Sequence, residues 1–166
     1  MDVSIYNQVY SLVKSIGAIG PIDLLINNAG IAHVGNVEST EEADFDRLYN
    51  VNIKGVFNCT KACIPFMKKA GKGVIVNLGS AAASVGHNDR FAYSMTKGAV
   101  LSMTYSVAKD YIDHGIRCNS VSPARVHTPF VDDFLAKNYP DNSAEMFEKL
   151  SKSHPIGRMG KATEVA

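Results

Sequence analysis

Ser80, Tyr93 and Lys97 are the residues whose types and spacing suit acid–base chemistry. Tyr93 and Lys97 lie four positions apart, so on a helix their side chains share one face. A phenol ordinarily ionises near a pKa of about 10, and a nearby ammonium group favours the ionised form, so that a tyrosine can serve as a general acid or base. A serine hydroxyl can donate a hydrogen bond to a carbonyl or alcohol oxygen. The three side chains together indicate proton exchange at a substrate oxygen.

The Tyr-x-x-x-Lys spacing is weak evidence by itself, because it occurs three times, beginning at Tyr10, Tyr93 and Tyr105. Only the pair that begins at Tyr93 follows a predicted strand that ends in Gly79-Ser80. The other two pairs are interpreted as residues of helix surfaces or of the core.

Short apolar strands alternate with amphipathic helices along the chain. The predicted strands are residues 24–26, 74–78 and 116–121, and the predicted helices are residues 5–16, 41–70, 91–113 and 143–151. Gly17 and Gly20 are expected to end the first helix, and Ser39 or Thr40 to cap the second. Apolar strands separated by helices predict a parallel α/β sheet covered on both faces. Ligands bind beyond the carboxyl ends of such strands, where the polar motifs of this sequence fall.

Five motifs, taken in order, resemble the short-chain dehydrogenase/reductase family in its short, single-domain subtype. They are Asn27-Asn28-Ala29-Gly30, Asn52 within residues 51–55, Ser80, the Tyr93 to Lys97 segment, and Asn119-Ser120-Val121-Ser122-Pro123. The resemblance covers almost the whole chain. It implies a doubly wound, Rossmann-like parallel sheet and an NAD(P)-dependent oxidoreductase that moves a hydride between a nicotinamide cofactor and an alcohol or carbonyl compound.

The resemblance also implies a role for each catalytic residue. Tyr93 would exchange a proton with the substrate oxygen, and Ser80 would hold that oxygen. Lys97 would make the Tyr93 phenol more acidic and bind the nicotinamide ribose. Asn52 would anchor a water molecule in a proton relay between Lys97 and solvent.

A second group of residues is expected at the cofactor. The Asn28-Ala29-Gly30 turn would lie against it, because small residues allow the backbone to approach closely. Val126 and Thr128 match positions near the nicotinamide, and Asp2 matches a position that often meets adenine. Tyr93 and Lys97 belong to this group as well.

The sequence lacks the family's glycine-rich turn, which places pyrophosphate at a helix N-terminus. Gly17-Ala18-Ile19-Gly20 follows a helix and precedes a strand, the reverse of the required order. We therefore expect residues 1–166 to form one partial domain, the catalytic half of the fold, without the first βαβαβ half and the last strand. The alternative to an active enzyme is an inactive fragment that does not bind cofactor by itself. The choice between NAD and NADP cannot be read.

Other function classes fit less well. The net charge is +1 with dispersed Lys and Arg, which argues against nucleic-acid binding. The sequence shows no membrane-spanning run and no signal peptide, so a cytoplasmic protein is expected. Three cysteines without CxxC spacing suggest free thiols, and the histidines show no metal-ligand spacing. A serine hydrolase is disfavoured, because Ser80 lacks the Gly-x-Ser-x-Gly elbow.

Substrate and assembly are the last expectations. Where the family commonly has Pro-Gly, this chain has Pro123-Ala124-Arg125. Arg125 is either a solvated loop residue or, with Arg90 and His87, part of a pocket for a sugar or sugar acid. Two helices carry more apolar positions than one sheet face needs, which together with the resemblance suggests a homodimer or homotetramer. These positions are Val56, Cys59, Cys63, Phe66 and Met67 on one helix, and Val100, Met103, Val107 and Tyr111 on the other.

Overall fold

A computed structural model describes residues 1–166, apart from the side chain of Asn138. The chain forms two compact units, residues Met1–Ser122 and Pro123–Ala166. The expectation that residues 1–166 make up one partial domain stays a prediction. No helix in the described part of the chain has both the length and the apolar character needed to cross a membrane.

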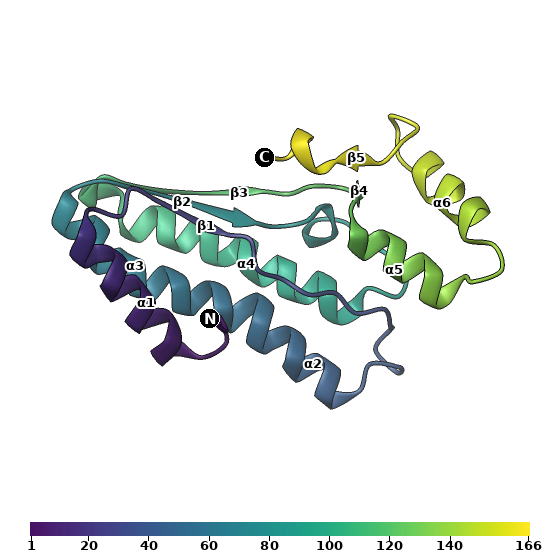
Figure 1. Ribbon diagram of the computed structural model, residues 1–166, viewed down its shortest axis with the longest axis horizontal. Coiled ribbons are helices and arrows are strands. Elements are labelled where there is room, and N and C mark those ends of the chain that lie inside the picture. Colours follow the sequence, from purple (N-terminus) through teal and green to yellow (C-terminus); the bar gives the residue numbers. More distant parts are fainter. The chain divides into compact units, whose positions relative to one another are not determined.

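The first unit is built on a parallel sheet of three strands (Figure 1). The strands β1 (Leu24–Asn27), β2 (Gly73–Leu78) and β3 (Ile116–Val121) lie in the order β1-β2-β3, with Leu24 opposite Val74 and Gly73 opposite Ile116. The helices are α1 (Tyr6–Ile19), α2 (Glu42–Leu48), α3 (Gly55–Ala70) and α4 (Phe91–Asp110). Three shorter helical segments are η1 (Tyr49–Lys54), η2 (Ala81–Ala83) and η3 (Ile112–His114). The parallel α/β sheet is therefore as predicted.

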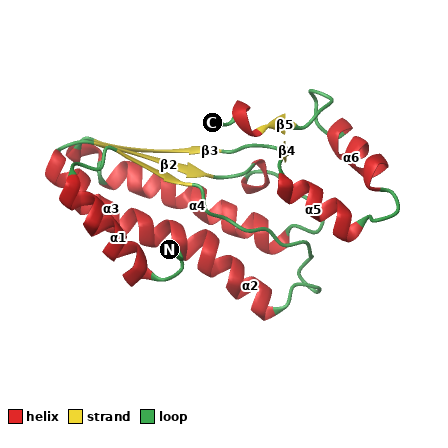
Figure 2. Cartoon of the chain, in the orientation of Figure 1, coloured by secondary structure: helices red, strands yellow, loops and turns green.

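The helices α1, α3 and α4 lie on one side of this sheet (Figure 2). On the covered face the side chains of Ile75 and Ile116 are fully buried. On the opposite face Leu24, Ile26 and Val121 are 52%, 55% and 41% exposed. The expectation that helices cover both faces of the sheet is therefore wrong in this structure: α1, α3 and α4 cover only one face. The strands do carry hydrophobic side chains on both faces.

The core lies between this covered face and the helices. Its buried residues are Val9, Val13, Ile22, Ala62, Cys63, Ile64, Met67, Ile75, Ile116 and Cys118. All three cysteines are free thiols, and burial raises the pKa of Cys63 and Cys118 to about 11. Of the apolar positions thought to exceed the needs of one sheet face, all but Met103 are buried or pack against this core. They are used within the chain, so they do not support an oligomer.

Two predicted helices differ from the structure. The first continues through Gly17 and ends at Ile19, with Gly20 as its C-cap. Gly17 lies against the Phe66 ring, where a Cβ would not fit. The predicted helix over residues 41–70 is interrupted by η1, a π-helical segment between α2 and α3. Ser39 and Thr40 do not cap α2, which begins after Glu41; both bond to Asn36 in the preceding turn.

The second unit contains α5 (Pro129–Asn138) and α6 (Ser143–Lys152), and the 3-10 segment η4 (Ala162–Glu164). It also holds a parallel pair of short strands, β4 (Val126–His127) and β5 (Gly160–Lys161). Val131, Leu135 and Met159 form its own small core. The helix expected near 143–151 is confirmed, and α5 was not predicted.

Candidate active site

Lys97 lies one helical turn beyond Tyr93 on α4, as the spacing predicted. Its side chain is only 7% exposed, and its Nζ donates a 2.6 Å hydrogen bond to the carbonyl of Leu78 at the end of β2. The same Nζ is 5.9 Å from the centre of the Tyr93 ring. Burial lowers the pKa of the Lys97 ammonium, because a charge loses hydration there. The strand end thus fixes a buried amino group beside the tyrosine.

Ser80 follows β2 and begins the short segment η2, against which α4 packs. Its Oγ accepts a 3.1 Å hydrogen bond from the amide of Ala82. Because that bond uses only an oxygen lone pair, the hydroxyl hydrogen can still be donated to another oxygen. Ser80 is thus half-buried beside the helix that carries Tyr93 and Lys97.

Asn52 is 1% exposed and lies in the π-helical segment η1. Its side chain pairs with the backbone of Ile31, accepting from the amide at 2.8 Å and donating to the carbonyl at 2.9 Å. Its Nδ2 also donates to the Oγ1 of Thr96 at 3.0 Å. A carboxamide has two N–H donors, and both are used here. The Asn52 side chain therefore serves to join three segments, and π-helical turns of this kind are frequent at functional sites.

Thr96 is a site residue that the sequence reasoning missed. It is fully buried, accepts from Asn52, and donates from its Oγ1 to the carbonyl of Tyr93 at 2.8 Å. A threonine three positions after Tyr93 could have been noticed, because a helical threonine commonly bonds back to the preceding turn. Its bond to Asn52, however, joins residues 44 positions apart, so no short sequence pattern could have predicted it.

The Asn28-Ala29-Gly30 turn follows β1 and is exposed. A Cβ on Gly30 would lie 3.5 Å from the Oδ1 of Asn52 and 3.6 Å from the Nζ of Lys97. Gly30 therefore borders the buried amino group, and the turn, Asn52 and Lys97 meet at the carboxyl ends of the strands.

Two buried amides beneath this edge were also missed. Asn27 donates from Nδ2 to the Oδ1 of Asn77 at 2.8 Å and to the Oγ1 of Thr60 at 3.2 Å. Asn77 in turn donates to the Oγ1 of Thr104 at 2.9 Å. These bonds link β1 and β2 to α3 and α4. Because unpaired buried amides are costly, the bonds favour this one register of the strands beneath the site.

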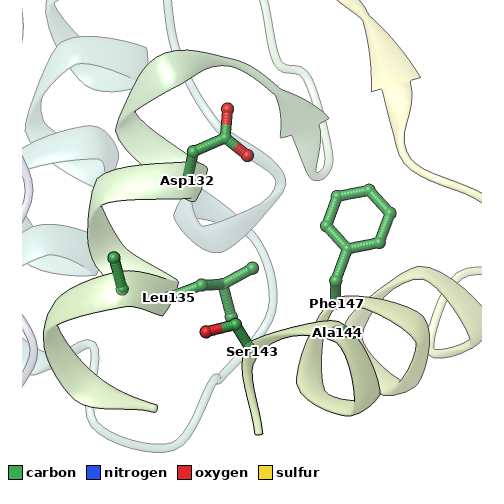
Figure 3. A pocket seen from close by; sticks show the side chains of 6 residues that line it. Asp132, Leu135, Ser143, Ala144 and Phe147 are labelled. Carbon is green, nitrogen blue, oxygen red and sulfur yellow. The ribbon is translucent and has the colours of Figure 1, made fainter. Parts of the chain in front are cut away.

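The remaining expected cofactor residues are Asp2 in the first unit and Val126 and Thr128 in the second. The carboxylate of Asp2 accepts hydrogen bonds from the hydroxyl and amide of Ser4, which lower its pKa. Val126 is in β4 and Thr128 precedes α5, so both belong to the second unit. That unit has a pocket of about 310 Å³ with largely apolar walls, shown in Figure 3. It is lined by Asp132, Leu135, Ala136, Ser143, Ala144 and Phe147.

The first unit thus presents a Tyr–Lys pair and a serine at the carboxyl edge of a parallel α/β sheet, a site suited to proton exchange at an oxygen atom. The family model described as short chain dehydrogenase matches residues 1–138. The chain belongs to this family of oxidoreductases, as the motifs predicted.

Known proteins agree with this assignment. An uncharacterized oxidoreductase of Thermotoga maritima is 41% identical over 154 residues, which are 92% of this chain and 60% of that protein. The ligand-free aldohexose dehydrogenase of Thermoplasma acidophilum superimposes with a TM-score of 0.93 at 33% identity, covering 99% of this chain and 66% of that one. A gluconate 5-dehydrogenase of Burkholderia cenocepacia, in complex with NADP and tartrate, gives 0.88 at 32% identity, covering 99% and 63%. The chain therefore spans about three fifths of the length of its relatives.

Proposed function

We propose that the protein containing this chain is an NAD(P)-dependent oxidoreductase acting on an alcohol or its carbonyl counterpart. The observation that carries the proposal is the buried amino group of Lys97, held at the Leu78 carbonyl one helical turn from Tyr93. Burying a lysine is unfavourable unless the protein gains something from it, and perturbed lysines cluster at functional sites.

The proposed chemistry follows from the side chains. In the oxidation direction the Tyr93 oxygen takes the proton of the substrate hydroxyl while the carbon loses a hydride. In reduction the same oxygen returns the proton. Ser80 donates its hydroxyl hydrogen to the reacting oxygen, and Lys97 stabilises the ionised form of Tyr93. Asn52 fixes the segments that carry these groups; the relay water expected at Asn52 stays a prediction.

The residues at the strand edge fit a nicotinamide cofactor. When bound, this group supplies the hydride acceptor or donor. Lys97 has three N–H donors and spends one on Leu78, so two remain for ribose hydroxyls. The exposed Asn28-Ala29-Gly30 turn leaves room beside Lys97. We keep Asp2, Val126 and Thr128 as proposed contacts, with NAD and NADP as alternatives.

Calorimetric titration of the 166-residue chain with NAD and NADP tests whether these residues bind cofactor by themselves or form an inactive fragment that does not. The chain has no glycine-rich turn for pyrophosphate, so we expect weak binding by these residues alone. Micromolar binding would contradict that expectation.

For the substrate we propose a sugar or a sugar acid. Two of the similar structures are dehydrogenases of an aldohexose and of gluconate, the latter holding tartrate. Arg90 immediately precedes α4, three positions before Tyr93, and His87 is exposed in the same loop. Arg125 is half-buried. Arginine suits recognition of carboxylates and clustered hydroxyls.

The test is a substrate panel of aldoses, aldonates, polyols and steroid alcohols, assayed with NAD and NADP by the absorbance of the reduced nicotinamide. We expect turnover of the polar compounds and a raised KM in Arg90→Ala and Arg125→Ala. A preference for steroids that both variants retain would refute the substrate proposal. If the protein that contains this chain turns over none of these compounds, the proposed oxidoreductase activity is refuted.

We also propose a homodimer or homotetramer in the cytoplasm, from the family resemblance. Sedimentation at micromolar concentration tests the assembly, and a monomer would contradict it.

A further inference from the structure

The segment between β1 and α2 is bonded to the start of the helix that carries Tyr93. The amide of Gly35 donates to the carbonyl of Asp89 at 3.0 Å, and the carbonyl of Gly35 accepts from the amide of Phe91 at 3.1 Å. The two bonds form an isolated parallel bridge between Gly35 and Arg90. Residues that are more than fifty positions apart are thus joined immediately before Tyr93.

This bridge supplies a hydrogen-bond acceptor for the first N–H group of α4, which has none within the helix. The first N–H groups of a helix lack partners within the helix. A side chain at the N-cap usually supplies one, but Arg90, the N-cap of α4, makes no such bond. The first amide of the helix, that of Phe91, instead bonds to Gly35. Tyr93 lies in this first turn, which is where helices fray.

The backbone around the bridge is adapted to it. Asp89 has φ 54°, and it is the only residue other than glycine in the described chain with a positive φ. Such a conformation costs free energy, although aspartate tolerates it better than most residues. It occurs at the residue whose carbonyl faces Gly35.

Gly35 is itself enclosed. A Cβ there would lie 2.7 Å from the Nε2 of His33, 3.1 Å from the Oγ1 of Thr40 and 3.2 Å from the Oγ of Ser39. Ser39 and Thr40 cannot move freely, because both bond to Asn36 in a closed turn. A larger residue at position 35 must therefore displace either the His33 ring or the bridge.

We propose that Gly35 is a positioning residue for Tyr93: its peptide group caps α4 from outside the helix and fixes the turn that carries the phenol. The proposal rests on the function proposed for Tyr93. Gly35 has no part in the chemistry and acts only through the position of the helix start.

The experiment compares Gly35→Ala with Gly20→Ala, because a methyl group on Gly20 would meet no atom within 4 Å and Gly20 has no place in the site. Hydrogen exchange of the Phe91 amide and the NMR signal of the Tyr93 ring, assigned with Tyr93→Phe, are measured in the 166-residue chain. The kcat and KM are measured with cofactor and substrate in the active protein that contains this chain. We expect Gly35→Ala to accelerate the exchange by roughly tenfold and to shift or broaden the ring signal. We expect kcat to fall by about ten- to a hundredfold with little change in KM. Gly20→Ala should change none of these.

His33→Ala combined with Gly35→Ala supplies the rescue, because it removes the nearest obstacle to the new methyl group. We expect it to restore most of the Phe91 protection and the Tyr93 signal. If Gly35→Ala unfolds the chain, this double variant decides the matter. Unchanged exchange at Phe91, or lost protection with an unchanged Tyr93 signal, overturns the proposal. If the protein that contains this chain shows no turnover, only the proposed function is contradicted, since exchange and NMR still report on the bridge.

Discussion

At the scale of single residues, the position of Lys97 explains why one Tyr–Lys pair matters among three. Tyr105 is 65% exposed and Tyr10 is 43% exposed, and the lysines that follow them are exposed as well. Lys97 alone among the three lysines is buried, and it is held by a backbone carbonyl. Burial and the hydrogen bond to Leu78 thus distinguish the pair at Tyr93 from the other two.

The first prediction follows from this contrast. Tyr93→Phe should remove nearly all turnover of the active protein and leave cofactor binding largely intact, because only the phenolic oxygen is lost. Tyr105→Phe is the matched control on the same helix and should retain turnover. Steady-state kinetics with a cofactor titration is the measurement. Equal losses in the two variants would show that the pair at Tyr93 is not the site.

A second prediction concerns Thr96. Thr96→Val keeps the volume but leaves one of the two N–H groups on Nδ2 of the buried Asn52 without an acceptor, and should destabilise the chain by about 1–3 kcal/mol. Thr96→Ser keeps the hydroxyl and should cost less. Urea unfolding compares the two. If serine costs as much as valine, the methyl group rather than the hydroxyl stabilises this position.

At the scale of elements, the clearest electrostatic feature is the turn that ends the second unit. Both oxygens of Glu164 accept from the guanidinium of Arg158 at 2.8 Å, and Oε2 also accepts from the amide of Lys161 at 2.7 Å. The hydrogen bonds from Arg158, followed by the one from Lys161, lower the pKa of Glu164 from an ordinary 4.5 to about 2. The carboxylate thus closes the turn around β5 and η4.

The third prediction is the pH dependence of this turn. Because the pKa is lower in the folded state, the stabilisation is fully present above 4.5 and is lost as the pH falls through about 2. Hydrogen exchange of the Lys161 amide should follow that loss. In Glu164→Ala, which removes the acceptor, the amide should be poorly protected throughout, while Glu145→Ala, at an exposed position in α6, should behave as the unmodified chain. Protection that persists in Glu164→Ala would contradict the assignment.

At the scale of the whole molecule, the sheet of the first unit has an apolar face that α1, α3 and α4 do not cover. Leu24 and Ile26 are more than half exposed on β1, which is an edge strand of this sheet. An edge with unpaired backbone groups beside exposed apolar side chains tends to associate with other chains.

The fourth prediction is that the 166-residue chain self-associates through this face at micromolar concentration. Ile26→Lys should reduce association, because a charge is unfavourable in an apolar contact. Ile19→Lys makes the same change at a side chain that is 90% exposed on α1, and should have little effect. Sedimentation velocity distinguishes the two. Equal effects would indicate that net charge, and not this face, controls association.

The sequence by itself predicted the three strands and most of the helices, because these depend on periodicity within one element. It also singled out Tyr93 and Lys97 among three Tyr–Lys pairs, because only this pair follows a strand that ends in Gly79-Ser80. The tertiary structure alone decided how the site is held. Asn52 meets Ile31 across 21 positions and Thr96 across 44, and Gly35 meets Phe91 across a longer interval. Short sequence patterns do not predict contacts between residues so far apart in the sequence. The π-helical segment at Asn52, the buried Thr96 and the bond from Phe91 to Gly35 at the start of α4 were therefore not predicted. The tertiary structure also decided which face of the sheet is covered: an apolar strand shows that two faces can be buried, and only the packing of the helices determines which one is.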